Sequence, residues 1–239
     1  MRVLGLIPAR GGSKGILRKN VRQLAGKPML HYTADAALSS VAAGVLARVI
    51  LSTEDAEIAD IGRACGLDVP FMRPLDLARD ETPMLPVIQH AIRFAQDGGD
   101  YYDAVCLLQP TTPLRSACDI ERAVKLLNDT GADSVISFVR VGDKHPARMK
   151  LVDDDGKVTN PPFAELMEGQ RRQDLPPLYL REGSIYLTRV SVLLGQGSLM
   201  GKDCRALIMP EERAVNVDSM LDLLLAEQLL LRSKEAVSH

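Results

Sequence analysis

Val3–Asn20 reads VLGLIPARGGSKGILRKN, and this stretch decides how the rest of the chain is interpreted. Its first residues, Val3 to Ile7, are apolar at nearly every position, which is typical of a strand that is buried on both faces of a sheet. Pro8 ends this strand, because proline has no N–H to donate to a neighbouring strand. The segment that follows combines glycines with basic residues, and this combination indicates a loop that binds an anion.

The glycine-rich segment predicts a polyphosphate site. Glycine backbone can bend so that successive N–H groups point at one anion, and nearby cationic side chains would neutralise its charge. The residues expected to contact phosphate are Arg10, Gly11, Gly12, Ser13, Lys14 and Lys19. A solvated basic turn is the alternative, but basic turns usually lack glycines in this number directly after a buried strand. The chain has neither G-x-x-x-x-G-K-[ST] nor G-x-G-x-x-G, so a dehydrogenase is not expected.

Composition and charge narrow the class of protein. Hydrophobic residues make up 46% of the chain and charged residues 25%, which is enough apolar material for one large core. A net charge of −2 argues against a general nucleic-acid or membrane surface, and no apolar run could span a bilayer. The cysteines and histidines show no metal-ligand spacing, so we expect buried thiols, no zinc site and a cytoplasmic location.

Strand and helix patterns alternate through the first half of the chain, which predicts an α/β fold with a mostly parallel, Rossmann-like sheet and helices on both faces. The expected strands are 3–7, 48–53, 69–72, 104–108, 134–139, 183–188 and 205–209. The expected helices are 29–41, one ending near Cys65, 86–96, 119–128 and 220–232. Ligands of such a sheet bind at the carboxyl ends of the strands, where the glycine-rich loop lies.

The alternation stops between residues 143 and 181, where paired prolines interrupt any regular pattern. A strand pattern resumes at 183–188. We therefore interpret 1–239 as a single domain and 143–181 as an insertion within it.

Ordered strings along the chain resemble signatures of the acylneuraminate cytidylyltransferases, which make CMP-sialic acid and related CMP-activated nonulosonic acids. The string I-P-A-R-G-G-S-K-G-I with R-K-N resembles the first signature, and L-L-Q-P-T-T-P-L-R at 107–115 resembles the second. Taken alone, the second string could be a plain strand-to-helix connection. The string R-R-Q-D-L-P-P-L-Y-L-R-E-G-S-I-Y at 171–186 resembles the segment that binds sugar and forms the dimer.

This sequence departs from the family pattern at a few positions. Leu17 stands where proline is frequent, and Thr112 replaces serine but keeps the hydroxyl. Glu182 stands where asparagine is common, and Ser184 where alanine is common. Because Glu182 adds negative charge near an anionic sugar, the resemblance leaves the identity of the sugar open.

The resemblance implies a fold like that of the nucleotide-diphospho-sugar transferases and an N-acylneuraminate cytidylyltransferase type of nucleotidyltransferase. CTP and an acidic nine-carbon sugar, an N-acylneuraminate, would give the CMP-sugar and diphosphate. It also implies a homodimer in which 143–181 contributes to the partner's site. The alternatives are the same reaction on legionaminate, pseudaminate or KDO, and a catalytically weak nucleotide-binding regulatory relative.

The resemblance also assigns residues to the two substrates. It adds four residues to the expected nucleotide site, namely Asn20, Arg73, Thr82 and Gln109. It assigns Gln109, Arg148, Arg172 and Tyr186 to the sugar site. Arg172 resembles the arginine that meets the sugar carboxylate, since a guanidinium can pair with a carboxylate through two hydrogen bonds. Arg148 could equally be an ordinary surface arginine. Lys14 is expected to be catalytic.

Asp218 is expected to be a catalytic residue and a Mg²⁺ ligand. From the residues alone, Asp218 or Ser219 reads as a helix N-cap with Asp222 in a capping box. The segment also resembles the family pattern D-x-D-T/S-x-x-D-L, whose acidic residues bind magnesium. Asn216 replaces the first acid, which leaves one carboxylate, and Mg²⁺ needs only one or two because it keeps several waters.

Overall fold

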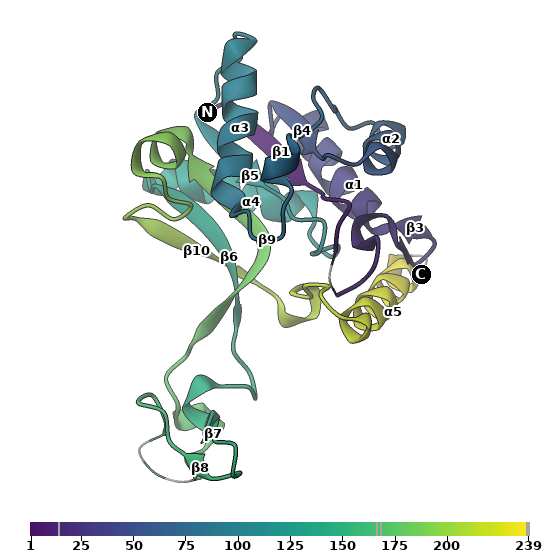
Figure 1. The fold of residues 1–239 in the computed structure, drawn as a ribbon. Helices are drawn as coiled ribbons and strands as arrows, with labels where there is room; N and C mark the ends of the chain where they lie inside the picture. Colours follow the sequence, from purple (N-terminus) through teal and green to yellow (C-terminus); the bar gives the residue numbers. More distant parts are fainter. Residues whose placement is uncertain (14, 166, 168, 238–239) are drawn as a thin grey trace.

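A computed structural model describes residues 1–13, 15–165, 167 and 169–237 (Figure 1). Its centre is a six-stranded sheet with the order β10-β6-β9-β5-β1-β4. The strands are β1 (Val3–Pro8), β4 (Arg48–Ser52), β5 (Ala104–Leu107), β6 (Ser134–Arg140), β9 (Tyr179–Arg189) and β10 (Cys204–Met209). β9 runs antiparallel to both neighbours, and the other pairs are parallel. The expected mostly parallel α/β sheet is therefore confirmed.

Helices cover both faces of this sheet. They are α1 (Met29–Ala42), α2 (Ala56–Ala64), α3 (Met84–Asp97), α4 (Ala117–Thr130) and α5 (Met220–Val237). Apolar side chains of α1, α2 and α4 pack on one face, and those of α3 pack on the other with the π-helical turn η5 (Val192–Gln196). α5 packs elsewhere, on a smaller apolar cluster that contains Leu24, Met29 and Val217.

Short elements fill the connections. The 3₁₀ helices are η1 (Lys19–Val21), η2 (Leu75–Leu77), η3 (Pro146–Arg148), η4 (Arg172–Asp174) and η6 (Glu211–Arg213). Two-residue strands form two further pairs, β2 (Gln23–Leu24) with β3 (Lys27–Pro28), and β7 (Leu151–Val152) with β8 (Val158–Thr159).

Between β6 and β9 the chain leaves the sheet as an arm, residues 141–178, which carries β7 and β8 away from the rest of the molecule (Figure 1). The predicted insertion 143–181 corresponds to this arm, except that 179–181 already belong to β9. The arm leaves large apolar side chains exposed, among them Met149, Leu151, Phe163 and Met167. A segment with such side chains and so little regular structure has few partners of its own to bury them against.

The strand expected at 69–72 is wrong. Only Asp68 pairs with the sheet, as a single bridge to Ile50. Pro70 follows and has no N–H for a ladder, while the Phe71 ring packs edge-on against His90 with ring centroids 4.7 Å apart. The chain is thus drawn towards α3 instead of along β4.

Two expectations from composition can be compared with the structure. Among the described residues, no helix is long and apolar enough to cross a membrane. Cys65, Cys106, Cys118 and Cys204 are free thiols, and only Cys106 is fully buried. Burial raises the pKa of Cys106 to about 12, so this thiol stays protonated.

Candidate active site

The carboxyl ends of β1 and β5 open onto a cavity of about 410 Å³. This is the edge of the sheet where the sequence predicts ligands. The cavity is lined by Pro8, Arg10, Ser13, Gly15, Lys19, Asn20, Arg73, Met84, Gln109, Pro110, Thr111 and Asp218. The structure therefore brings together residues that lie far apart in the chain, and many of them are residues that the sequence assigns to nucleotide or metal.

Side chains from within the loop and from α2 hold the glycine-rich loop in shape. Asn20 is buried and donates from Nδ2 to the Arg10 carbonyl over 2.8 Å, which ties the two ends of the loop together. Arg18 has a left-handed backbone (φ 54°) and is held at the start of α2 by Asp55, whose side chain is 21% exposed. Its second partner, Glu57, is 63% exposed and adds only a weak contact. The hydrogen bonds from Arg18 lower the pKa of Asp55 below its usual value.

Close approaches of backbone explain two of the glycines. A Cβ on Gly11 would lie 2.4 Å from Asp55 Oδ2, and one on Gly15 would lie 2.4 Å from the Asp218 carbonyl oxygen. Gly15 thereby lets the loop rest on the segment that begins α5. The Gly11 N–H donates to Glu54 Oε1 over 2.7 Å. The sequence instead predicts that this amide donates to a phosphate.

Two cationic side chains of the cavity pair with exposed carboxylates. Arg10 Nη1 lies 2.7 Å from Asp80 Oδ1, and the two side chains are 34% and 41% exposed. Lys19 Nζ lies 2.8 Å from Asp218 Oδ1, and the Asp218 side chain is 65% exposed. The Lys19 side chain is 15% exposed, but both carboxylates face water, which weakens their pairs, so an incoming phosphate can replace either carboxylate.

A third cation is held differently. Arg73 Nη2 donates to Glu54 Oε2 over 2.7 Å, with the two side chains only 4% and 13% exposed. Because Glu54 also accepts the Gly11 N–H, it contacts the loop and the arginine at once. Removing one partner from such a buried pair would leave an uncompensated charge.

In the segment before α5, different residues form the helix cap and the candidate metal ligand. Ser219 and Asp222 form the capping contacts, since Ser219 Oγ accepts from Asp222 N and Asp222 Oδ2 accepts from Ser219 N. Asp218 instead accepts from Lys19 Nζ and, over 2.6 Å, from Asn216 Nδ2. Ser219, and not Asp218, is therefore the N-cap of α5.

The oxygen atoms at this segment fit a Mg²⁺ ion. Asn216 Oδ1 is buried and has no hydrogen-bond partner among the described residues, and the Asp218 carboxylate lies beside it. Where the chain is described, no group of three or more His, Cys, Asp or Glu side chains could hold a metal. A site with one carboxylate and one amide oxygen suits Mg²⁺, which takes its other ligands from water and phosphate.

The remaining residues assigned to nucleotide lie outside this cavity or outside the description. Lys14 is outside the described residues. Gly12 is exposed, and a Cβ there would meet no atom. Thr82 is half-buried and donates from its hydroxyl to the Asp76 carbonyl over 2.9 Å, so its hydroxyl is already used.

The residues assigned to the sugar are not gathered within one chain. Arg148 lies in the arm, where Nη2 donates to the Gln170 carbonyl over 3.3 Å. The backbone of Arg172 lies in η4, also in the arm, and its side chain is outside the description. Tyr186 is buried in the cluster under α3, beneath the Arg181 guanidinium, and this burial raises its pKa. Among the members of this set whose side chains are described, Gln109 alone lines the cavity.

Sequence reasoning missed the two carboxylates that pair with the cavity arginines. Glu54 comes shortly after β4, and a residue that follows a parallel strand lies at the ligand edge of the sheet, a signal that could have identified it. Asp80 lies in an irregular segment beyond η2, and no local pattern marks it as a partner of Arg10.

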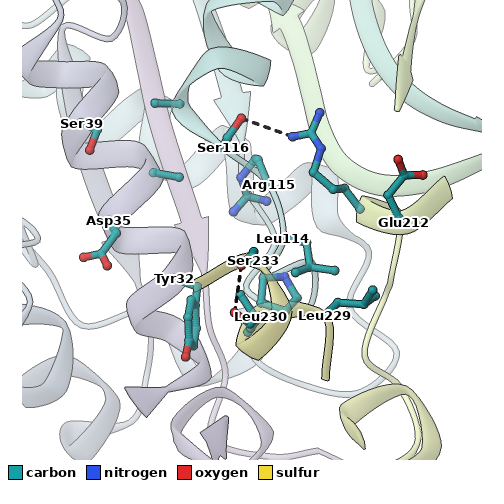
Figure 2. Close-up of a pocket in the computed structure, with 14 residues that line it drawn as sticks. Tyr32, Asp35, Ser39, Leu114, Arg115, Ser116, Glu212, Leu229, Leu230 and Ser233 are labelled. Carbon is teal, nitrogen blue, oxygen red and sulfur yellow. Dashed lines mark hydrogen bonds between the residues drawn. The ribbon is translucent and has the colours of Figure 1, made fainter. Parts of the chain in front are cut away.

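A larger cavity of about 600 Å³ lies on the other side of the Gln109–Arg115 connection, between α1, η6 and α5 (Figure 2). Arg115 is fully buried at its edge and braces the connection by donating to carbonyls of Gln109 and Ser184. Burial lowers the pKa of Arg115 to about 10. The other arginine of this cavity, Arg213, is paired with Asp119. Arg115 already donates from both Nη atoms to protein groups, Arg213 is paired, and Asp35 and Glu212 add negative charge to the wall, so we place the candidate site in the smaller cavity.

Comparison with known proteins gives one family. The family model described as cytidylyltransferase matches residues 4–193. The chain is 32% identical to CMP-N,N'-diacetyllegionaminic acid synthase of Legionella pneumophila, over 99% of this chain and 100% of that protein. It is 31% identical to N-acylneuraminate cytidylyltransferase of Streptococcus agalactiae over 94% of this chain, and spans about half (52%) of that longer protein.

A solved structure shares the fold. CMP:2-keto-3-deoxy-manno-octonic acid synthetase in complex with CTP superposes with a TM-score of 0.68, covering 98% of this chain and 100% of the other at 18% identity. At this identity the similarity speaks for the fold alone.

Because Asp80 pairs with Arg10, we predict that the Asp80 carboxylate opposes the binding of an anion to Arg10. Asp80→Asn should tighten the binding of inorganic tripolyphosphate about two- to fivefold, because an exposed ion pair is worth at most about 1 kcal/mol. Calorimetric titration measures this affinity. Asp60→Asn, which removes the same charge from an exposed pair on α2, is the control and should change affinity less. Equal or weaker binding by Asp80→Asn would refute the competition.

Proposed function

This chain belongs to the cytidylyltransferase family, and from that premise we propose that it transfers CMP from CTP to a nine-carbon 2-keto sugar acid with release of diphosphate. The chain is a nucleotidyltransferase. The observation that carries the proposal is the convergence of Arg10, Lys19 and Arg73 on one cavity at the carboxyl ends of the strands. A triphosphate is the ligand whose charge matches this set, with Lys14 of the same loop as a further expected cation.

The reaction requires positioning and charge neutralisation more than covalent chemistry from the protein. A sugar hydroxyl attacks the α-phosphorus of CTP, the new O–P bond forms, and diphosphate leaves with the bridging oxygen. Negative charge grows on the phosphoryl oxygens and the leaving group, where cationic side chains fixed in advance lower the barrier. Arg10 and Lys19 supply such charge once phosphate displaces Asp80 and Asp218.

We propose that Gln109 contacts both the nucleotide and the sugar. It lines the cavity, and a Cβ at Gly183 would come within 3.2 Å of its side-chain oxygen, so the glycine gives the amide room. Thr82 is the weakest of the proposed nucleotide contacts, because its hydroxyl already donates to Asp76. Arg172 remains our proposed partner for the sugar carboxylate, and Arg148 and Tyr186 its proposed neighbours.

Within the class of sugar acids, an N-acylneuraminate and a legionaminate are the two leading substrates. The Legionella relative, matched along its whole length, is named for diacetyllegionaminic acid, and the streptococcal relative for N-acylneuraminate. The test is diphosphate release from CTP with purified N-acetylneuraminate, diacetyllegionaminate, pseudaminate and KDO. We expect turnover with at least one nine-carbon acid and preference for CTP over ATP and GTP. Equal use of ATP, or turnover with KDO alone, would overturn the proposal.

Mg²⁺ is the proposed cofactor, with Asp218 as its charged ligand and Asn216 Oδ1 as a neutral one. When bound, the ion would neutralise phosphate charge as the reaction proceeds. Asp218 could additionally orient the sugar hydroxyl or accept its proton. A second candidate function follows from Asn216: a chain with one acid fewer could bind nucleotide and regulate without efficient turnover.

Substitutions at Asp218 and Asn216 separate these functions. Asp218→Asn should leave thermal stability nearly unchanged, because Ser219 provides the cap, while the Mg²⁺ concentration for half-maximal turnover rises at least about tenfold. Asn216→Asp should lower that concentration. Magnesium titrations of turnover for wild type and both variants measure this. An unmoved magnesium curve for Asp218→Asn would remove this residue from the metal site, and a turnover gained only by Asn216→Asp would favour the regulatory relative.

We also propose that the enzyme is a homodimer whose arms complete each other's sites. The arm carries Arg148 and Arg172 away from the chain's own cavity and exposes apolar side chains, which a second copy would cover.

Mixed dimers test this sharing. Arg172→Ala and Lys14→Ala chains should each be inactive, but their heterodimer should regain activity, because one of its two sites receives both intact residues. Heterodimers isolated with two different affinity tags and assayed for diphosphate release give the measurement. A monomer by light scattering, or an inactive heterodimer, would contradict shared sites.

A further inference from the structure

We propose that Glu54 is a positioning residue for nucleotide binding, because its carboxylate fixes the glycine-rich loop and Arg73 with respect to each other. The inference rests on the proposed function, since it assigns a role within the CTP site. Glu54 itself does not line the cavity and would act through the two groups that it holds.

Both oxygens of the Glu54 carboxylate are used. Oε1 accepts the Gly11 N–H over 2.7 Å, and Oε2 accepts from Arg73 Nη2 over 2.7 Å. Glu54 follows β4, Gly11 follows β1, and Arg73 lies beyond the Asp68 bridge, so one side chain joins three connections at the ligand edge. The Glu54 side chain is 13% exposed and accepts a hydrogen bond at each carboxylate oxygen, so it has little freedom to move.

Arg73 has hydrogen-bonding capacity that the protein does not use. It lines the cavity, yet its Nε is buried and has no hydrogen-bond partner among the described residues. A buried N–H without an acceptor is costly, and an acceptor on a bound ligand would complete its bonding. By holding Nη2, Glu54 sets the orientation of the guanidinium that Arg73 presents at the cavity.

A gain in folding stability alone does not explain the Glu54–Arg73 pair. A buried ion pair is often no better for stability than apolar side chains of the same volume, because both charges must be desolvated. Glu57 shows the contrast three residues later: it also pairs with an arginine of the loop region, Arg18, but its side chain is 63% exposed and neither partner lines the cavity. Glu57 therefore serves as the matched control.

The experiment compares Glu54→Gln and Glu54→Asp with Glu57→Gln in the full chain. Glutamine keeps one oxygen and turns an NH₂ towards the other donor, so it can satisfy Gly11 or Arg73 but not both. Aspartate keeps the charge but is one methylene too short to span both partners. Calorimetry with CTP should give about tenfold to a hundredfold weaker binding for Glu54→Gln, an intermediate loss for Glu54→Asp, and less than twofold change for Glu57→Gln.

Steady-state kinetics and thermal unfolding distinguish positioning from a structural role. A positioning role raises KM for CTP by more than it lowers kcat, with the folded fraction unchanged. A structural role lowers the thermal midpoint and the active fraction, which reduces apparent kcat at an unchanged KM. If Glu54→Gln does not fold, Glu54→Asp carries the test. CTP affinities within twofold of wild type for the Glu54 variants overturn the inference alone, whereas a wild type that binds no CTP overturns both this inference and the proposed function.

Discussion

The contact between Gly15 and the Asp218 carbonyl is the constraint on which the site depends. It leaves no space for a Cβ, so the first loop of the chain rests directly on the segment before its last helix. That approach allows Lys19 to donate to both the Val217 carbonyl and Asp218. The loop contributes cations and the segment before α5 contributes carboxylate and amide oxygens, so the proposed site needs both.

The site is arranged so that charge is balanced before any ligand binds, but the balancing carboxylates differ in how firmly they are held. Glu54 is only 13% exposed and accepts a hydrogen bond at each carboxylate oxygen, so it stays with Arg73 when a ligand binds. Asp80 and Asp218 are exposed, and phosphate or metal can take over their partners at low cost. Burial therefore separates the permanent counter-ion from the exchangeable ones, a distinction that a tally of ion pairs would not reveal.

Much of the fold could be predicted because its signals are local. Apolar runs and helical periodicity located β1, α1 and α5 to within a few residues, and the glycine-rich loop located the ligand edge. The antiparallel direction of β9 could not be predicted, since an alternating pattern is the same in either direction. Glu54 and Asp80 were missed for a related reason, because pairing between distant loops leaves no periodic pattern in the sequence. Lys14 and the side chain of Arg172 lie outside the description.

The direction of β9 has a topological consequence. β6 ends at the same edge of the sheet as β1 and β5, and β9, running the opposite way, begins there. Whatever joins these two strands must emerge beside the ligand cavity, whatever its length. The connection can therefore grow, shrink or change composition without shifting the register of any core strand. In this architecture the part of the chain most tolerant of insertion also begins and ends next to the candidate site, so new selectivity can be acquired without redesigning the core.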